Sequence, residues 1–236
     1  MEKNKTAKYV KYAIGEIVLV VIGILIALQI NNWNDLQKLK KEEQNTLAKL
    51  FNESEQIIKY LNAISSKYDD LISMVDKSAQ ALNKKALQDM SLDEFAFGVY
   101  STAYYEAIAP PKSTFEELNN TGRINNIQSD SVRKRISDYY SELEYINTQL
   151  IYFRNQFTNP VETGGKDFVY VYDERSHAKI KPRVNFEQLA QNDLFISKHV
   201  KALRDQIVFN ETRKRLLELA KKMHQELEKE IENKND

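Results

Sequence analysis

The sequence predicts an all-α protein in which an N-terminal transmembrane helix leads into an antiparallel, up-down-up-down four-helix bundle, with a small strand or hairpin insertion near residues 166–173. Three observations support this fold class. An apolar run near the N-terminus is long enough to cross a bilayer, and apolar residues recur three or four positions apart over several later stretches. The 236 residues include only six Gly and four Pro, which disfavours the many turns of an all-β domain.

The apolar run covers residues 13–30 and is interrupted only by Glu16 and Gln29. As a helix that rises about 1.5 Å per residue, it spans the roughly 30 Å hydrocarbon layer of a lipid bilayer. A cleaved signal peptide needs small residues just after the run, and Leu28 to Asn31 supply none. We therefore expect an uncleaved signal anchor.

Charge before the span sets the expected orientation. The first 12 residues carry one Glu and four lysines: Lys3, Lys5, Lys8 and Lys11. Because basic flanks resist translocation, we expect residues 1–12 to be a cytoplasmic tail and residues 31–236 to be a periplasmic domain at the inner membrane. Lys8, Lys11 and Trp33 are expected at the membrane interface, where an indole ring keeps its N–H in contact with water.

The first body helix is expected over residues 47–82, where apolar residues form a heptad seam. No Pro or Gly occurs between Ile24 and Gly98. We therefore expect the anchor to continue into this helix without a break, so that the helix projects roughly 70 Å or more from the bilayer. Residues 83–90 are expected to form a turn.

The second leg is expected to begin with a capped helix. Ser91 and Glu94 have the spacing of a capping box ahead of the sequence LDEFAFGVYSTAYYEAIA, residues 92–109. Pro110 and Pro111 follow this helical sequence directly and are expected to stop it.

A short helix over residues 115–120 is expected to complete the second leg. Ser113 and Glu116 repeat the capping-box spacing at its start. Gly122 follows its end, where glycine readily adopts the left-handed conformation that closes a helix.

A third long helix is expected from Ser129 or Asp130, with an apolar seam from Val132 to Phe157 that ends before Pro160. After Gly164 and Gly165, the run DFVYVY alternates in the manner of a strand. Asn185 with Gln188 opens a short helix, and the last long helix is expected from Asp193 toward the C-terminus, returning toward the bilayer.

Composition removes several classes of function. The chain has 34 basic and 34 acidic residues, so no cationic excess favours nucleic acid as a partner. It has no Cys, and its three histidines show no ligand spacing, so neither a thiol nucleophile nor a recognised zinc motif is present. No Walker loop, GxGxxG or GxSxG motif occurs either. We therefore expect no cofactor and no catalytic or metal site.

The first candidate site lies inside the membrane span. Glu16, Gly23 and Ala27 share one helix stripe, and the two small residues have small-xxx-small spacing. This pattern suggests a membrane helix contact with a second copy or with another membrane protein. The alternative is that Glu16 lies shallow enough to reach the lipid headgroups.

The second candidate site is the strand-like run. Phe168, Tyr170 and Tyr172 could belong to an edge offered to a partner, whereas pairing within a small hairpin is the simpler explanation. Tyrosines on the second and third legs could line a pocket for a small ligand, but helical spacing favours packing in the seams. These tyrosines are Tyr100, Tyr104, Tyr105, Tyr139, Tyr140, Tyr145 and Tyr152.

Two blocks resemble a known family. Residues 11–34, which contain GEIVLVVIGILIALQINNWN, are similar to the anchor signature of a family of uncharacterised, single-span bacterial membrane proteins, a domain of unknown function. Residues 114–140 are similar to its second block, with a Glu-Leu, Gly, Leu/Ile-Arg-Tyr pattern. The resemblance implies a membrane-attached helical body without assigned catalytic residues, and it makes Glu16, Trp33 and Gly122 typical positions.

Together these observations favour a non-enzymatic interaction or scaffold module of the cell envelope, which binds another protein or itself. The alternative is a helical bundle that senses a small ligand and signals through a partner protein, because 12 residues cannot hold a cytoplasmic output domain. The third hypothesis is an enzyme, which would require a buried pocket with convergent titratable groups.

Overall fold

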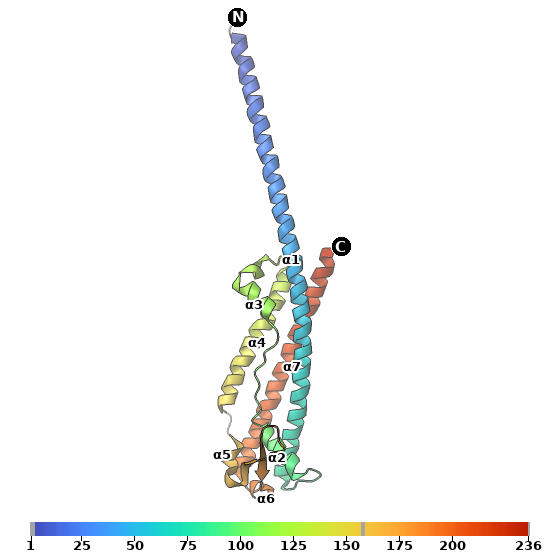
Figure 1. Cartoon of the computed structure of the whole chain (residues 1–236), viewed down its shortest axis with the longest axis vertical. Helices are drawn as coiled ribbons and strands as arrows, with labels where there is room; N and C mark the ends of the chain where they lie inside the picture. The colour runs from blue at the N-terminus through green and yellow to red at the C-terminus, as the bar shows by residue number, and fades with distance from the viewer. Residues whose placement is uncertain (1–2, 157–158, 236) are drawn as a thin grey trace.

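The long helices of the protein run side by side through its body (Figure 1). The computed structural model describes residues 3–156 and 159–235, with side chains described for residues 15–154 and 159–234. The elements, in chain order, are α1 (Lys3–Lys84), α2 (Leu92–Ser101), α3 (Ser113–Asn120), η1 (Arg123–Asn126), α4 (Asp130–Gln156), α5 (Pro160–Gly164), η2 (Gly165–Asp167), β1 (Phe168–Tyr172), β2 (Ile180–Val184), α6 (Phe186–Leu189) and α7 (Asp193–Asn235).

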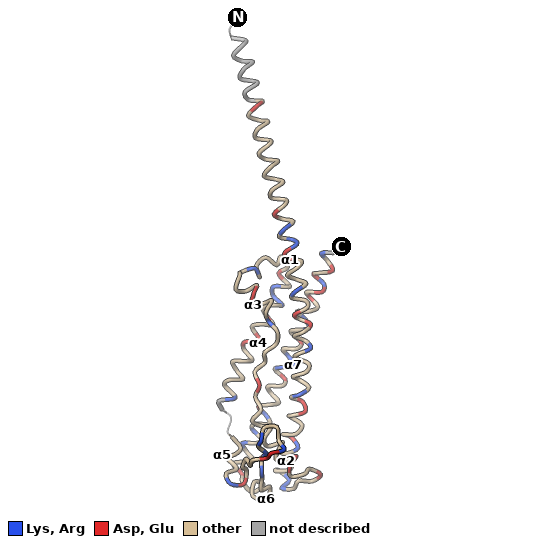
Figure 2. Tube along the Cα trace, viewed as in Figure 1, with Lys and Arg blue, Asp and Glu red and all other residues tan. Residues whose placement is uncertain are grey.

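The predicted continuity of the first helix is confirmed, because α1 runs without interruption from Lys3 to Lys84. Its residues 15–42 are all exposed. Figure 2 shows a long stretch of this part of α1 without charge, which corresponds to residues 17–34. Within the described ranges, α1 is the one helix whose length and composition would let it cross a membrane. The structure is therefore compatible with a single-pass membrane protein.

Below this exposed part, the predicted seams form the core of the body. The buried residues of α1 include Leu47, Leu50, Ile57, Leu61 and Ile64, and those of α4 include Val132, Ile136, Tyr139, Leu143 and Ile146. They pack with Leu216, Leu217, Ala220, Met223 and Leu227 of α7. Each large apolar side chain removed from water contributes roughly 1.5–3 kcal/mol. Phe157, the last residue of the predicted third seam, lies outside the described residues.

The second leg differs from the prediction, because its first helix is shorter than the expected residues 92–109. α2 ends at Ser101, and residues 104–112, called the strap below, form neither helix nor strand and run as a drawn-out segment along the body (Figure 1). The chain still alternates direction from leg to leg, but only three of its legs are long helices (Figure 1). Since an extended strap is thinner than a helix, a groove of about 940 Å³ remains between the strap, α3 and α4.

Side chains of the neighbouring helices hold the strap extended. The hydroxyl of Tyr60 accepts a hydrogen bond from the backbone N–H of Ala109 at 3.0 Å. The side-chain amide of Asn147 accepts from the N–H of Ile108 at 3.0 Å and donates to its C=O at 2.9 Å. These bonds replace those of a helix. Pro111 also disfavours a helical conformation for the residue that precedes it.

The N-terminus of α3 is capped from another helix. Lys112 occupies the N-cap position without a side-chain hydrogen bond, so the predicted capping box of Ser113 and Glu116 is wrong. The buried carboxylate of Glu53 on α1 accepts instead from the N–H of Thr114 at 2.6 Å. At the other end of α3, Gly122 has a φ of 69°, which confirms its predicted left-handed conformation.

The end of the body farthest from the apolar part of α1, called the tip, has a small core of its own. The predicted capping box between Ser91 and Glu94 is confirmed at α2, and β1 pairs with β2 in an antiparallel hairpin. This second core contains Ala81, Leu82, Phe95, Val99, Phe168, Leu189, Ala190 and Phe195.

The opposite end of the body, called the base, is tied by a buried carboxylate. Glu43 of α1 is 4 % exposed and accepts from the backbone N–H of Gln128 at 2.7 Å. Lys234 of α7 also donates to Glu43 at 2.7 Å. The last helix therefore returns along α1 to the base, as predicted, and ends beside the point where α1 leaves the body (Figure 1).

Candidate functional site

One face of the hairpin is apolar, because side chains alternate along each strand. The register places Phe168, Tyr170 and Tyr172 on this face, opposite Val184, Pro182 and Ile180. Phe168 is fully buried, so its side chain belongs to the core of the tip and is not available to a partner. Exposure rises along β1 to 36 % at Tyr170 and 71 % at Tyr172. The sequence had suggested all three residues for a partner edge.

The exposed end of this face continues onto α2. Tyr170 packs edge-to-face on Tyr100 with ring centroids 6.1 Å apart, and Phe97 lies 6.5 Å from Tyr100. All of these aromatic residues are at least one-third exposed. We call this surface the tip patch, and it consists of Phe97, Tyr100, Tyr170, Tyr172 and Ile180.

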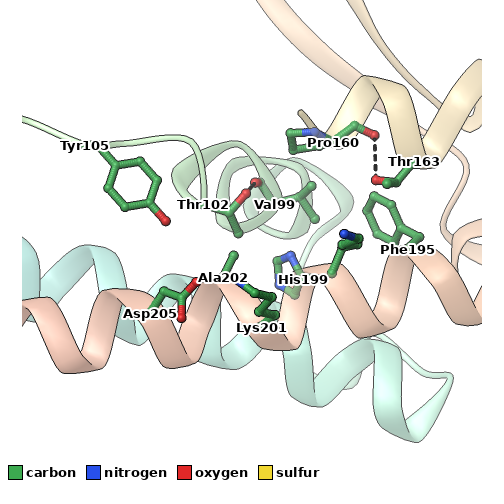
Figure 3. A pocket seen from close by; sticks show the side chains of 11 residues that line it. Val99, Thr102, Tyr105, Pro160, Thr163, Phe195, His199, Lys201, Ala202 and Asp205 are labelled. Atoms are coloured by element: carbon green, nitrogen blue, oxygen red, sulfur yellow. Dashed lines mark hydrogen bonds and ion pairs between the residues drawn. The ribbon is translucent and has the colours of Figure 1, made fainter. Parts of the chain in front are cut away.

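A small cavity lies where α2, α5 and α7 meet (Figure 3). Its volume is about 30 Å³, which suits one or two water molecules rather than a metabolite. Figure 3 shows its lining side chains, which include Val99, Thr102, Tyr105, Thr163, His199 and Asp205.

His199 is a buried histidine held by α1. The hydroxyl of Ser78 donates to the C=O of Val75 at 2.8 Å, so its oxygen is free to accept from Nε2–H of His199, 2.9 Å away. This network places the ring proton on Nε2. Burial lowers the pKa of His199 to about 4, although the nearby C=O of Val75 opposes that shift. The imidazole is therefore neutral at pH 7.

Arg213 of α7 is fully buried in the body. Its guanidinium carbon lies 3.4 Å from the ring centroid of Tyr68 and 5.8 Å from that of Phe209. Burial lowers the pKa of Arg213, while Tyr68 and Glu106 oppose this shift. The group nevertheless remains charged at physiological pH, as arginine does in proteins.

Most of the tyrosines fill seams or lie on the surface. Tyr139 and Tyr140 are buried, and the ring of Tyr140 stacks on Phe115 at 3.7 Å. Tyr145 and Tyr152 are more than half exposed on α4. The seam interpretation therefore describes the third leg better than a tyrosine-lined pocket does.

Sequence reasoning missed three polar residues that organise the body. Glu43 and Arg213 each precede a buried leucine, Leu47 or Leu217, by four positions, so a charged residue at a seam position was the available signal. Nothing local marks Glu53, whose partners lie about 60 positions away or more.

The described residues that are expected in the membrane or at its interface lie where the body does not cover them. Glu16, Gly23, Ala27 and Trp33 are all exposed on α1. Gly23 has no atom of a neighbouring element within 4 Å of the position of a Cβ. The side chains of Lys8 and Lys11 lie outside those described. The membrane contact and the interface positions therefore stay predictions.

Comparison with known proteins places the chain in one family. No curated protein and no solved structure matches the chain. The model of a family of unknown function, DUF6090, matches residues 16–169, from the apolar part of α1 into β1. The match leaves out β2 and α7, and therefore also Arg213. Because it covers more than half of the 236 residues, the chain belongs to the family of unknown function DUF6090.

Proposed function

We propose that the protein is a non-enzymatic interaction module of the bacterial inner membrane, which holds a protein-binding tip at a set height above the periplasmic surface. The observation that carries this proposal is the unbroken course of α1 from the apolar segment to the tip. From Ile30 to Lys84, a helix rising about 1.5 Å per residue extends about 80 Å. The tip patch would thus stand far from the lipid.

The way the body is attached to α1 supports a fixed height. α7 packs along α1 through most of the body. The bond between Lys234 and Glu43 holds the end of α7 to α1 at the base. No Gly or Pro interrupts α1 between the span and the body. A continuous helix without these residues resists the sharp bends that would lower the tip.

The tip patch supports a protein as the occupant of the tip. Tyrosine contributes strongly to protein interfaces because it buries a large area while retaining a hydroxyl for hydrogen bonding. Tyr172, 71 % exposed, lies at the outer end of an apolar hairpin face. The inner end of that face is already packed by Phe168, so the hairpin is held rigidly.

Orientation can be tested with single cysteines, because the chain has none of its own. We expect a membrane-impermeant maleimide added to spheroplasts to label His177→Cys, at the exposed hairpin loop, and to spare Lys5→Cys. Labelling of Lys5→Cys but not of His177→Cys would contradict the proposed orientation. Recovery of the intact chain in the soluble fraction would contradict the membrane anchor.

Protein binding by the tip, called the display role below, can be tested by photo-crosslinking in native membranes. A photoreactive residue at Tyr172 should give a discrete crosslinked protein, whereas one at Lys59, on the exposed side of α1, should not. Adding Tyr100→Ala, which removes a second residue of the tip patch, should weaken the adduct formed at position 172. The absence of a discrete adduct at position 172, or the same adduct from both positions, would contradict the proposal.

A further inference from the structure

Arg213 poses an energetic problem that the proposed display role does not address. Its side chain is 0 % exposed, and Nε, Nη1 and Nη2 all lack a hydrogen-bond partner among the described residues. Burying a charge without a partner is unfavourable relative to water, and arginine cannot avoid this cost by losing its proton. Stacking on Tyr68 compensates only in part, since a cation–π contact leaves the N–H groups of the guanidinium without acceptors.

Three carboxylates of α1, the strap and α7 are already engaged with other cations. Asp69 accepts from Lys214 at 3.1 Å, and Glu106 accepts from Lys67 at 2.9 Å. Asp205 pairs with Lys201 at 2.6 Å. None of these three carboxylates forms a hydrogen bond or an ion pair with Arg213, although the charge of Glu106 opposes the lowering of the Arg213 pKa.

Further polar atoms lie on the same face of α7. Gln206, Asn210 and Arg213 are four and three positions apart, so they share one helix face. All three residues are buried, and the carbonyl oxygens of Gln206 and Asn210 also lack a described partner. Their amide groups are held in place, because Gln206 donates to the C=O of Ser101 and Asn210 donates to Asp69. Buried donors and acceptors without partners are rare in protein cores, so this face calls for a partner that the described residues do not supply.

The strap covers this face. The backbone N–H of Glu106 donates to the hydroxyl of Tyr68 at 2.9 Å, and the ring of Tyr68 stacks on the guanidinium of Arg213. Tyr105 packs edge-to-face on Phe209 and also lines the cavity between α2, α5 and α7. Movement of the strap around Tyr105 would thus connect that cavity with Arg213.

We propose that Arg213 anchors a binding site for a small molecule with a single carboxylate group, reached when strap residues 104–107 move away from Tyr68. The ligand's carboxylate accepts two hydrogen bonds from the edge of the guanidinium, while the ring of Tyr68 supports its face. A monoanion fits better than a phosphate, because one unpaired positive charge cannot balance a dianion. The aromatic surroundings favour an apolar body on the ligand.

The test uses the full chain in lipid nanodiscs and measures the midpoint of thermal unfolding. The probes are formate, acetate, propionate and benzoate, each compared with chloride at the same ionic strength. Acetamide and benzamide serve as uncharged controls of nearly the same shape as acetate and benzoate. Because a ligand that binds only the folded state stabilises it by mass action, at least one carboxylate should raise the midpoint saturably. The amides should have no effect.

Arg213→Met and Arg215→Met form a matched pair of variants. Methionine at position 213 removes the buried charge but keeps an apolar chain, so the variant should fold at least as stably as the natural chain. It should weaken carboxylate binding at least tenfold. Arg215→Met, in an exposed residue paired with Glu142, should bind as the natural chain does.

A third variant tests the role of the strap. Tyr68→Phe removes the acceptor of the Glu106 N–H, so amides of residues 104–107 should exchange hydrogen faster and carboxylate should bind faster. The proposal is overturned if none of the four carboxylates shifts the unfolding midpoint saturably, or if acetamide and benzamide shift it equally. It is also overturned if Arg213→Met still responds to the carboxylates. Unchanged association kinetics in Tyr68→Phe would overturn the strap as the route of entry.

Discussion

The carboxylate of Glu53 accepts a hydrogen bond from the backbone N–H of Thr114 at 2.6 Å, although 61 positions separate the two residues. It also accepts from the N–H of Phe115 at 3.2 Å and from the hydroxyl of Tyr140 at 3.0 Å. One buried side chain of α1 thereby caps α3 and anchors α4. A negative charge at a helix N-terminus is also favourable, because the first N–H groups carry partial positive charge.

Replacing this carboxylate by an amide should destabilise the body. We expect Glu53→Gln to lower the free energy of unfolding by about 1–3 kcal/mol, because the amide loses an acceptor oxygen and its NH₂ faces other donors. Thermal unfolding followed by near-ultraviolet circular dichroism measures this change. Glu55→Gln, at an exposed residue paired only with Lys59, should change stability by less than about 0.5 kcal/mol and is the control.

Burial of His199 should make stability depend on pH. Its pKa is about 4 when folded, against 6.5 for an ordinary histidine, so the unfolded chain binds the proton first as pH falls. The contribution of the neutral ring is complete above pH 6.5 and is lost progressively between pH 6.5 and 4, amounting to about 3 kcal/mol. Denaturant titrations at pH 7 and pH 5 should show about 2 kcal/mol of this loss.

Two glutamine variants isolate the histidine responsible. His199→Gln, which can still reach Ser78, should flatten the dependence between pH 7 and pH 5. His177→Gln, at an exposed loop position, should leave it unchanged. An equal slope in His199→Gln and the natural chain would show that other groups cause the dependence.

The packing of α2 on α1 requires glycine at position 98. A Cβ there would lie 2.6 Å from the C=O of Met74 and 2.7 Å from the hydroxyl of Ser78, closer than atoms can approach. Gly98→Ala should therefore displace α2 and cost about 1–3 kcal/mol, with faster hydrogen exchange over residues 92–101. Gly15→Ala, where no neighbouring atom lies within 4 Å, should not affect the body. Unchanged exchange in Gly98→Ala would mean that α1 and α2 can adjust without cost.

The expected membrane contact can be tested by disulfide formation between copies. Ala27→Cys lies on the stripe with Gly23, whereas Leu25→Cys lies on another face of the helix. We expect oxidation to join copies through position 27 and not through position 25. Adding Gly23→Ile to Ala27→Cys should reduce the product at least several-fold, because a large side chain keeps the helices apart. Equal products at both positions would leave the span without a preferred face.

Local rules were enough to predict the helices and the ends of several of them. The seam of α1, the capping box of Ser91 with Glu94 and the left-handed Gly122 each depend on residues within a few positions of one another. The apolar run of residues 13–30 likewise needs only its own composition to indicate a membrane helix. The structure confirms the seam, the capping box and the conformation of Gly122, because no distant contact competes with them, and it shows residues 15–30 as an exposed part of α1.

The extended strap, by contrast, depended on the tertiary structure. Residues 92–109 have the composition of a helix, but Tyr60, Tyr68 and Asn147 offer hydrogen bonds to the strap from other helices. Those bonds give partners to backbone groups after Ser101 that have none within a helix. The sequence does not show which side chains lie opposite the strap, so it could not predict this outcome.

The candidate sites divide in the same way. The apolar run, the helical seams and the strand that contains Tyr170 and Tyr172 could be predicted from the sequence, because each depends on spacing along one element. The core position of Phe168, the capping role of Glu53 and the burial of Arg213 without a described hydrogen-bond partner could not, because they depend on segments far apart in the chain. Burial of a charge depends on what packs around it, and in this protein those neighbours come from other helices and from the strap.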